Sequence, residues 1–398
     1  VWGLSVGQIS TINACFAIGA LFGGVFSAWF ADRFGRHIGM TLALLLGGIG
    51  ALITSLSPSY ELLLVFRTIC GFGIAAAIVL EAPYLCEMVP GEHRSRWQGI
   101  IGIIGVLGIP VSAFIARKIL AFGPETWRYV AAIPSIGILI AILFWFIVPE
   151  SPRWLVAHNR MDEAKKIFKN LTGQELLIDT THCRNDVKVS YIETLKIMGN
   201  HKYIKRSIFC LTICVVLNNT GWMVNQLLPT LLVSEGLDTE SSMFVQELLT
   251  VSMVLAPLFL VLFGDKGGRK LPYAFTMCVT GISLFFLAQI GISNVNYLYI
   301  TVLMIGWAMF THQNFAVLFS SELFPTRVRS MVIGVINILV RIGMILSQAL
   351  IVPFLYNNYG FKGYFSTLAA IYLIMSLFIL VIAPKTAGKS LEELNSDI

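Results

Sequence analysis

Long apolar stretches separated by short polar segments dominate this sequence. Each stretch holds about 20 mainly hydrophobic residues, the length that an α-helix needs to cross the hydrocarbon core of a bilayer. Glycine and proline occur inside several of them, which membrane helices tolerate better than soluble helices do. The pattern predicts eleven spanning helices, over residues 9–30, 38–57, 61–83, 97–120, 127–148, 206–233, 243–263, 271–291, 297–320, 331–355 and 362–383.

The composition supports this prediction. The chain is 56% hydrophobic and 13% charged, with a mean hydropathy of +0.78, whereas about a quarter of the residues in a soluble domain are charged. We therefore predict an all-α integral membrane protein whose main surroundings are the lipid bilayer. The net charge of +6 does not indicate nucleic-acid binding, because the basic residues are confined to particular loops.

The distribution of basic residues predicts the topology. One set of alternate loops contains Arg33, Arg36, Arg94 and the strongly basic segment 149–206, while the opposite loops hold few cations and include an acidic one at 234–242. By the positive-inside rule, the first set faces the cytoplasm, and so does the C-terminus. We expect a multi-pass protein of the plasma membrane or of an intracellular vesicle membrane.

Two pairs of matching segments indicate an internal duplication. Glu87-Met-Val-Pro-Gly-Glu-His-Arg94-Ser recurs 235 residues later as Glu322-Leu-Phe-Pro-Thr-Arg-Val-Arg329-Ser. At an offset of 233 residues, Asp32-Arg-Phe-Gly-Arg36 matches Asp265-Lys-Gly-Gly-Arg269. Because both pairs occur in the same order, the chain is interpreted as two copies of one helical unit.

The duplication predicts the domain organisation. We expect an N-terminal transmembrane bundle over 1–148, a cytoplasmic linker with short helices over 149–205, a C-terminal bundle over 206–383 and a cytoplasmic tail over 384–398. The second copy has six predicted spans and the first has five, so the first copy lacks its opening helix. We expect that preceding sequence supplies this helix; the alternative is a protein that begins at the second helix.

Several motifs resemble those of the major facilitator superfamily. They are Asp32-Arg-Phe-Gly-Arg36, Arg67-Thr-Ile-Cys-Gly71-Phe-Gly73, Pro149-Glu-Ser-Pro-Arg-Trp-Leu155 and Pro384-Lys-Thr-Ala-Gly388. Within the superfamily, Pro149–Leu155 is shared by sugar porters, organic-ion transporters and synaptic-vesicle-2-related proteins. The sugar porters' paired glutamines are absent from the seventh helix, and Glu322–Ser330 followed by Arg341 resembles the organic-ion and synaptic-vesicle-2-related branch, so a hexose carrier is placed second.

The resemblance implies a fold of two six-helix bundles, here with helices 2–6 and 7–12, that rock to give alternating access. It also implies that charged residues on the cytoplasmic side form a gate that closes that side. The alternative is that these charged residues serve only as positive-inside anchors that set the topology. The predicted gate residues are Asp32, Arg33, Arg36, Glu87, Arg94, Asp265, Arg269, Glu322 and Arg329.

Polar residues at membrane depth are candidates for the substrate pathway, because ionisable groups there are costly and usually face a cavity or a partner. Arg341 could bind a carboxylate or sulfate with a two-point fork; its alternative is a structural ion pair. Arg67 is a coupling or structural residue. Further candidates, which could instead join helices, are Asn218, Asn219, Trp222, Asn225, Gln226, His312, Gln313 and Asn314.

We therefore predict a secondary transporter that moves a small organic solute, with an organic anion as the leading candidate. The alternatives are a hexose or polyol porter and a transport-inactive receptor or scaffold. H+ or another ion could couple transport. The sequence has no catalytic triad, metal-ligand cluster or phosphate loop, so we expect no enzyme activity, no cofactor and no metal. A monomer without a nucleic-acid partner is expected.

Overall fold

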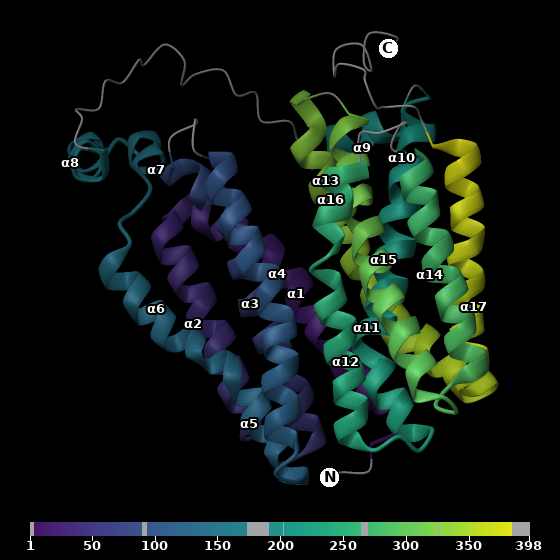
Figure 1. The fold of residues 1–398 in the computed structure, drawn as a ribbon. Coiled ribbons are helices and arrows are strands. Elements are labelled where there is room, and N and C mark those ends of the chain that lie inside the picture. The colour runs from purple at the N-terminus through teal and green to yellow at the C-terminus, as the bar shows by residue number, and fades with distance from the viewer. Residues whose placement is uncertain are drawn as a thin grey trace. The chain divides into compact units, whose positions relative to one another are not determined.

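The computed structural model describes residues 4–89, 94–172, 191–201, 203–263, 270–324 and 326–383. These residues form helices and their connections, without strands (Figure 1). The chain divides into two compact units. The N-unit comprises residues 12–105 and 123–188, and the C-unit comprises residues 1–11, 106–122 and 189–398.

The N-unit is built around α2, which packs along α3 and also against α5 and α6. Glycine makes the contact between α2 and α3 possible: a Cβ atom on Gly73 would lie 2.0 Å from the backbone nitrogen of Gly47. Small residues of this kind let membrane helices approach closely. Its helices are α1 (Val6–Phe34), α2 (Arg36–Ser55), α3 (Tyr60–Met88), α4 (Arg94–Leu120), η2 (Pro124–Thr126), α5 (Trp127–Ala132), η3 (Ile133–Ser135), α6 (Ile136–Ile147), α7 (Pro152–Ala157) and α8 (Met161–Thr172); α1 and α4 each continue into the C-unit.

The C-unit has a large apolar core in which α14 packs against α15 and α17. Two fully buried tyrosines of α17 tie this core to α11: Tyr364 donates to the carbonyl of Met223 (3.3 Å), and Tyr372 to that of Leu217 (3.4 Å). Its further helices are α9 (Tyr191–Gly199), α10 (Ile204–Leu211), η4 (Thr212–Val216), α11 (Leu217–Ser234), α12 (Thr239–Met253), α13 (Ala256–Phe263), α14 (Lys270–Ile290), α15 (Val295–Glu322), α16 (Thr326–Leu346), η5 (Ser347–Ile351) and α17 (Val352–Ile382).

The predicted all-helical membrane fold is confirmed. Each of the eleven apolar stretches coincides with helical structure. Among the described residues, nine helices are long and apolar enough to span a membrane, and the last of them, Met331–Ile382, covers two predicted stretches. Large apolar side chains such as Phe146 (80% exposed) and Val381 (79% exposed) lie on the surface, where lipid rather than water would contact them. Whether the chain divides at 148, 205 and 383 stays a prediction.

An arginine binds one carbonyl group at the end of α2 and one just after it. Arg128 donates through Nη1 to the backbone carbonyls of Ser55 and Ser57, both at 2.9 Å, and these two serines are buried. Replacing Arg128 with Ala should lower the free energy of unfolding by about 1–3 kcal/mol, because buried carbonyls lose their donors. Thermal unfolding in detergent measures this, with Arg160→Ala, which removes an exposed ion pair, as the control. Equal destabilisation by both variants would contradict the prediction.

A carboxylate caps α12. Oδ2 of Asp238 accepts a hydrogen bond from the backbone N–H of Ser241 at 2.8 Å, and this bond lowers the pKa of Asp238 below its usual value. The stabilisation is therefore complete above the ordinary pKa of aspartate, about 3.9, and is lost as the pH falls through the lowered pKa.

This pKa shift predicts an acid-dependent stability. Asp238→Asn keeps an acceptor but removes the charge, so the variant should unfold at a lower temperature than the wild type at pH 7. The gap should narrow as the pH falls towards 3, when the wild-type carboxylate becomes protonated. Unfolding temperatures measured across that range test this, and a gap of constant size would refute the assignment.

Candidate functional site

Three of the predicted gate residues meet beside the turn between α1 and α2. Arg36 binds Asp32 through Nη2 (2.7 Å) and Glu87 of α3 through Nε (3.2 Å). The side chains of Arg36 and Glu87 are only 16% and 19% exposed, so their attraction is screened less than that of a surface pair. Arg33 instead lies over the rings of Trp29 and Phe34.

The remaining predicted gate residues are Arg94, Asp265, Arg269, Glu322 and Arg329. Asp265 and Arg269, together with the side chains of Arg94, Glu322 and Arg329, lie outside the part of the chain that the structure describes. The gate in the second copy therefore stays a prediction.

Glu150 extends the network and was missed as a site residue. Its Oε1 accepts from the backbone N–H groups of His37 (3.1 Å) and Ser151 (2.8 Å). It thereby supplies a negative charge at the N-terminus of α2, where the N-cap residue Gly35 has no side chain to do so. The motif Pro149–Leu155 carried this signal, because it places an acid directly after the sixth predicted helix of the family.

Two more contacts join the segment after α6 to the same network. The hydroxyl of Tyr84 donates to the carbonyl of Pro149, and Nε1 of Trp154 donates to the carbonyl of Asp32 at 2.9 Å. The N-unit therefore holds α1, α2, α3 and α7 together at one end, through side chains that a rearrangement of these helices would have to release.

Two hydrogen-bonded pairs of amide side chains form an amide cluster in the C-unit: Gln348 with Gln226, and Gln246 with Asn225. Gln348 of η5 is fully buried and donates to Oε1 of Gln226 on α11 at 3.0 Å. Gln246 of α12 donates to Oδ1 of Asn225 at 3.5 Å. The predicted residues Asn225 and Gln226 thus meet two amides that sequence reasoning missed. Gln348 lies in a π-helical turn, a feature frequent at functional sites, but the sequence does not reveal such a turn.

Three buried amide oxygens of the C-unit have no hydrogen-bond donor among the described residues: Oδ1 of Asn219, Oε1 of Gln246 and Oε1 of Gln348. Buried polar atoms are nearly always paired, so each of these oxygens calls for a donor. Asn219 itself donates to the carbonyl of Val215 at 2.6 Å. α16 approaches it closely, since a Cβ on Gly343 would lie 2.4 Å from Nδ2 of Asn219. Asn218 is half-buried.

The two predicted arginines sit in different units. Arg341 is half-buried on α16, seven residues before Gln348, and forms no ion pair with a described acid. Arg67 lies in the N-unit with its guanidinium 5.0 Å from the ring of Phe16. Its Nε has no acceptor among the described residues.

The polar residues of α15 bond mostly to their own helix. His312 is fully buried, with Nδ1 3.1 Å from the carbonyl of Ala308, and it meets Tyr372 edge to face. Asn314 donates to the carbonyl of Phe310. Gln313 is half-buried beside Gly221, and Trp222 is 41% exposed. A role for these residues in substrate binding stays a prediction.

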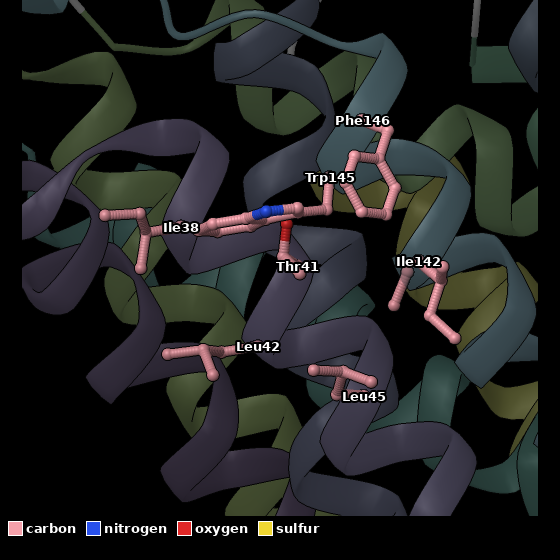
Figure 2. A pocket seen from close by; sticks show the side chains of 8 residues that line it. Ile38, Thr41, Leu42, Leu45, Ile142, Trp145 and Phe146 are labelled. Carbon is pink, nitrogen blue, oxygen red and sulfur yellow. The ribbon is translucent and has the colours of Figure 1, made fainter.

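A groove of about 310 Å³ on the N-unit offers a different environment (Figure 2). It lies between α2 and α6, and the hydroxyl of Thr41 donates to the carbonyl of His37 in its own helix. The groove therefore suits an apolar chain rather than a polar solute. Its lining residues are Ile38, Thr41, Leu42, Leu45, Ala141, Ile142, Trp145 and Phe146.

Known proteins resemble this chain over nearly its whole length. Residues 4–398 match the family described as sugar (and other) transporters. The YdjK protein of Escherichia coli (strain K12) is 28% identical, over 96% of this chain and 83% of that protein. The arabinose-proton symporter of Bacillus subtilis (strain 168) is 26% identical, over 99% of this chain and 87% of that protein.

The fold has a counterpart among solved structures. The crystal structure of a D-xylose-proton symporter superposes with a TM-score of 0.76 over 98% of this chain and 91% of that chain, at 18% identity. The predicted major facilitator fold is thereby confirmed. The comparisons give no support to the organic-ion and synaptic-vesicle-2-related branch, and they favour the sugar porters that sequence analysis placed second. The chain is a membrane transporter and belongs to the sugar (and other) transporter family.

Proposed function

We propose that this protein carries a small neutral polyhydroxylated solute, a sugar or a polyol, by alternating access. The observation that carries the proposal is the set of three buried amide oxygens of Asn219, Gln246 and Gln348 without donors among the described residues. Hydroxyl groups both donate and accept, so a polyol can satisfy these oxygens and the amide N–H groups beside them. This revises the organic anion that the sequence alone favours.

The unpaired oxygens discriminate between solute classes. An ionised carboxylate or sulfate only accepts hydrogen bonds, so it would leave the amide oxygens without donors. Its negative charge would also lie against the negative partial charges of these oxygens. A buried polar group without a partner costs about 1–3 kcal/mol. The amide cluster therefore favours a hydroxylated solute over a simple anion.

We also propose that the Arg36 network forms part of the cytoplasmic gate and that H+ drives transport. The partly buried Arg36–Glu87 pair and the Glu150 contacts at the start of α2 suit a latch that holds when this side is closed. The similar protein of Bacillus subtilis is named an arabinose-proton symporter, which supports coupling to H+ here. The cytoplasmic placement of this end follows from the positive-inside rule.

Arg341 favours a second candidate, a hydroxylated acid such as a sugar acid. Its guanidinium has no ion-pair partner among the described acids, and seven residues separate it from Gln348, which places both near one face of the helix. A sugar acid would give hydroxyl donors to the amides and a carboxylate to Arg341.

A binding panel tests both candidates. Purified protein is heated with D-xylose, L-arabinose, D-glucose, a sugar alcohol, D-glucuronate or succinate, and the shift in unfolding temperature is measured, because a ligand that binds the folded state stabilises it. We expect neutral sugars or polyols to stabilise the wild type, equally well after Arg341→Ala. Stabilisation by glucuronate that disappears in Arg341→Ala would favour the acid. A shift with succinate alone would overturn both.

A further inference from the structure

A second partly buried ion pair lies in the C-unit, at the end opposite to the basic loops. Nε of Arg117 donates to Oε2 of Glu247 at 2.7 Å. Arg117 lies in the last turn of α4, and Glu247 lies on α12, eight residues after its first residue Thr239. The C-terminal end of α4 and the N-terminal end of α12 adjoin loops that the charge distribution assigns to the outer side of the membrane.

The surroundings of this pair make it strong. The side chains are only 16% and 17% exposed, and the Arg117 guanidinium also lies 5.3 Å from the ring of Phe244 and 5.7 Å from that of Phe114. Apolar rings exclude water and attract a cation over their faces. At low local dielectric an ion pair is stronger than at a wet surface, and removing one partner leaves an uncompensated buried charge.

The pair joins the two copies of the repeat. α4 precedes the linker and so belongs to the first copy, whereas α12 follows the linker and belongs to the second. Nevertheless residues 106–122 cluster with the C-unit, so this part of α4 is held by the second copy. An opening of the transporter towards the outer side requires helices of the two copies to separate there.

We propose that Arg117 and Glu247 form an outer latch that holds the outer end closed and must break when the transporter opens outward. The proposal rests on alternating access from the proposed function. The latch also adjoins the amide cluster, because Gln246, which contacts Asn225, precedes Glu247 on α12. A solute that engages Gln246 therefore acts on the same turn of α12 that carries the latch acid.

Labelling from the outer side tests the latch without any solute. A thiol is introduced by Asn225→Cys, and its reaction with a membrane-impermeant maleimide is followed in intact cells, relative to protein without that thiol. Breaking the latch with Glu247→Gln or Arg117→Gln should raise the labelling rate at least about fivefold, because the outward-open population grows. Reversing the pair with Arg117→Glu and Glu247→Arg together should restore slow labelling.

A neighbouring cation provides the control. Lys118→Gln removes a charge beside Arg117 that lies over Phe114, and it should label like the parent. Labelling of the Arg117 and Glu247 variants at the rate of Lys118→Gln would overturn the latch. So would fast labelling in the charge-reversed double variant that runs as a monodisperse species in gel filtration. A wrong solute class would leave these rates unchanged, so the two proposals fail separately.

Discussion

Replacing Gln348 with Leu is expected to reduce sugar uptake at low solute concentration by about 10–100-fold. The substitution keeps the side-chain volume close to the original but removes the donor that Gln226 accepts from and one of the three unpaired amide oxygens. A site built to hydrogen-bond a hydroxylated solute loses about 1–3 kcal/mol for each buried partner left unpaired. Initial rates of D-xylose uptake, normalised to protein in the membrane, measure the loss.

The control for this prediction lies on the same stretch of chain. Asn337 of α16 is exposed and donates to the carbonyl of Ile333 in its own helix. Asn337→Leu should therefore leave uptake within about twofold of wild type. Equal rates in Gln348→Leu and Asn337→Leu would show that Gln348 does not contact the solute.

Gly35→Ala is expected to destabilise the N-unit severely, by about 3 kcal/mol or more. Gly35 has a φ of 117°, a conformation that costs a residue with a Cβ about 1–3 kcal/mol. That Cβ would also lie 2.1 Å from Oε2 of Glu150. Displacing Glu150 breaks its bonds to His37 and Ser151, and hydrogen bonds to charged groups contribute about 1.5–3 kcal/mol each.

Gly123 separates the two causes. It has a φ of 144° but nothing within 4 Å of its would-be Cβ, so Gly123→Ala should cost only the backbone strain. The unfolding temperature in detergent should fall further for Gly35→Ala than for Gly123→Ala. In a Glu150→Ala background the extra loss from Gly35→Ala should vanish. A persistent difference in that background would mean that Glu150 is not what Gly35 accommodates.

The helical fold could be predicted from the sequence because it depends on length and hydropathy alone. A run of about 20 apolar residues has no other stable state in a bilayer than a helix, so each predicted stretch is found as a helix. The Arg36–Glu87 pair was also within reach, because both residues belong to the repeated motifs. Motif position, however, could not show that Glu150 caps α2, since that depends on the backbone conformation of Gly35.

The amide cluster was only half predicted. Asn225 and Gln226 stood out as polar residues in an apolar helix, but Gln246 and Gln348 lie close to span ends or inside a π-helical turn, where periodicity gives no signal. Arg341 indicated an anion, because an arginine within a span can bind a carboxylate or sulfate with a two-point fork. The choice between an anion and a polyol depends on which buried polar atoms lack hydrogen-bond partners. The sequence does not show this, because it depends on how the helices pack.

Transport by purified protein in liposomes tests whether the protein carries a sugar or polyol. Proteoliposomes are given radiolabelled D-xylose, with and without an inward proton gradient, in the presence of excess unlabelled L-arabinose or succinate. We expect uptake above that of protein-free liposomes, and we expect the proton gradient to increase it. L-arabinose should compete with D-xylose, succinate should leave uptake unchanged, and Gln348→Leu should reduce uptake about 10–100-fold. Uptake of radiolabelled succinate with no uptake of D-xylose, L-arabinose or a sugar alcohol would contradict the proposed transport of a sugar or polyol.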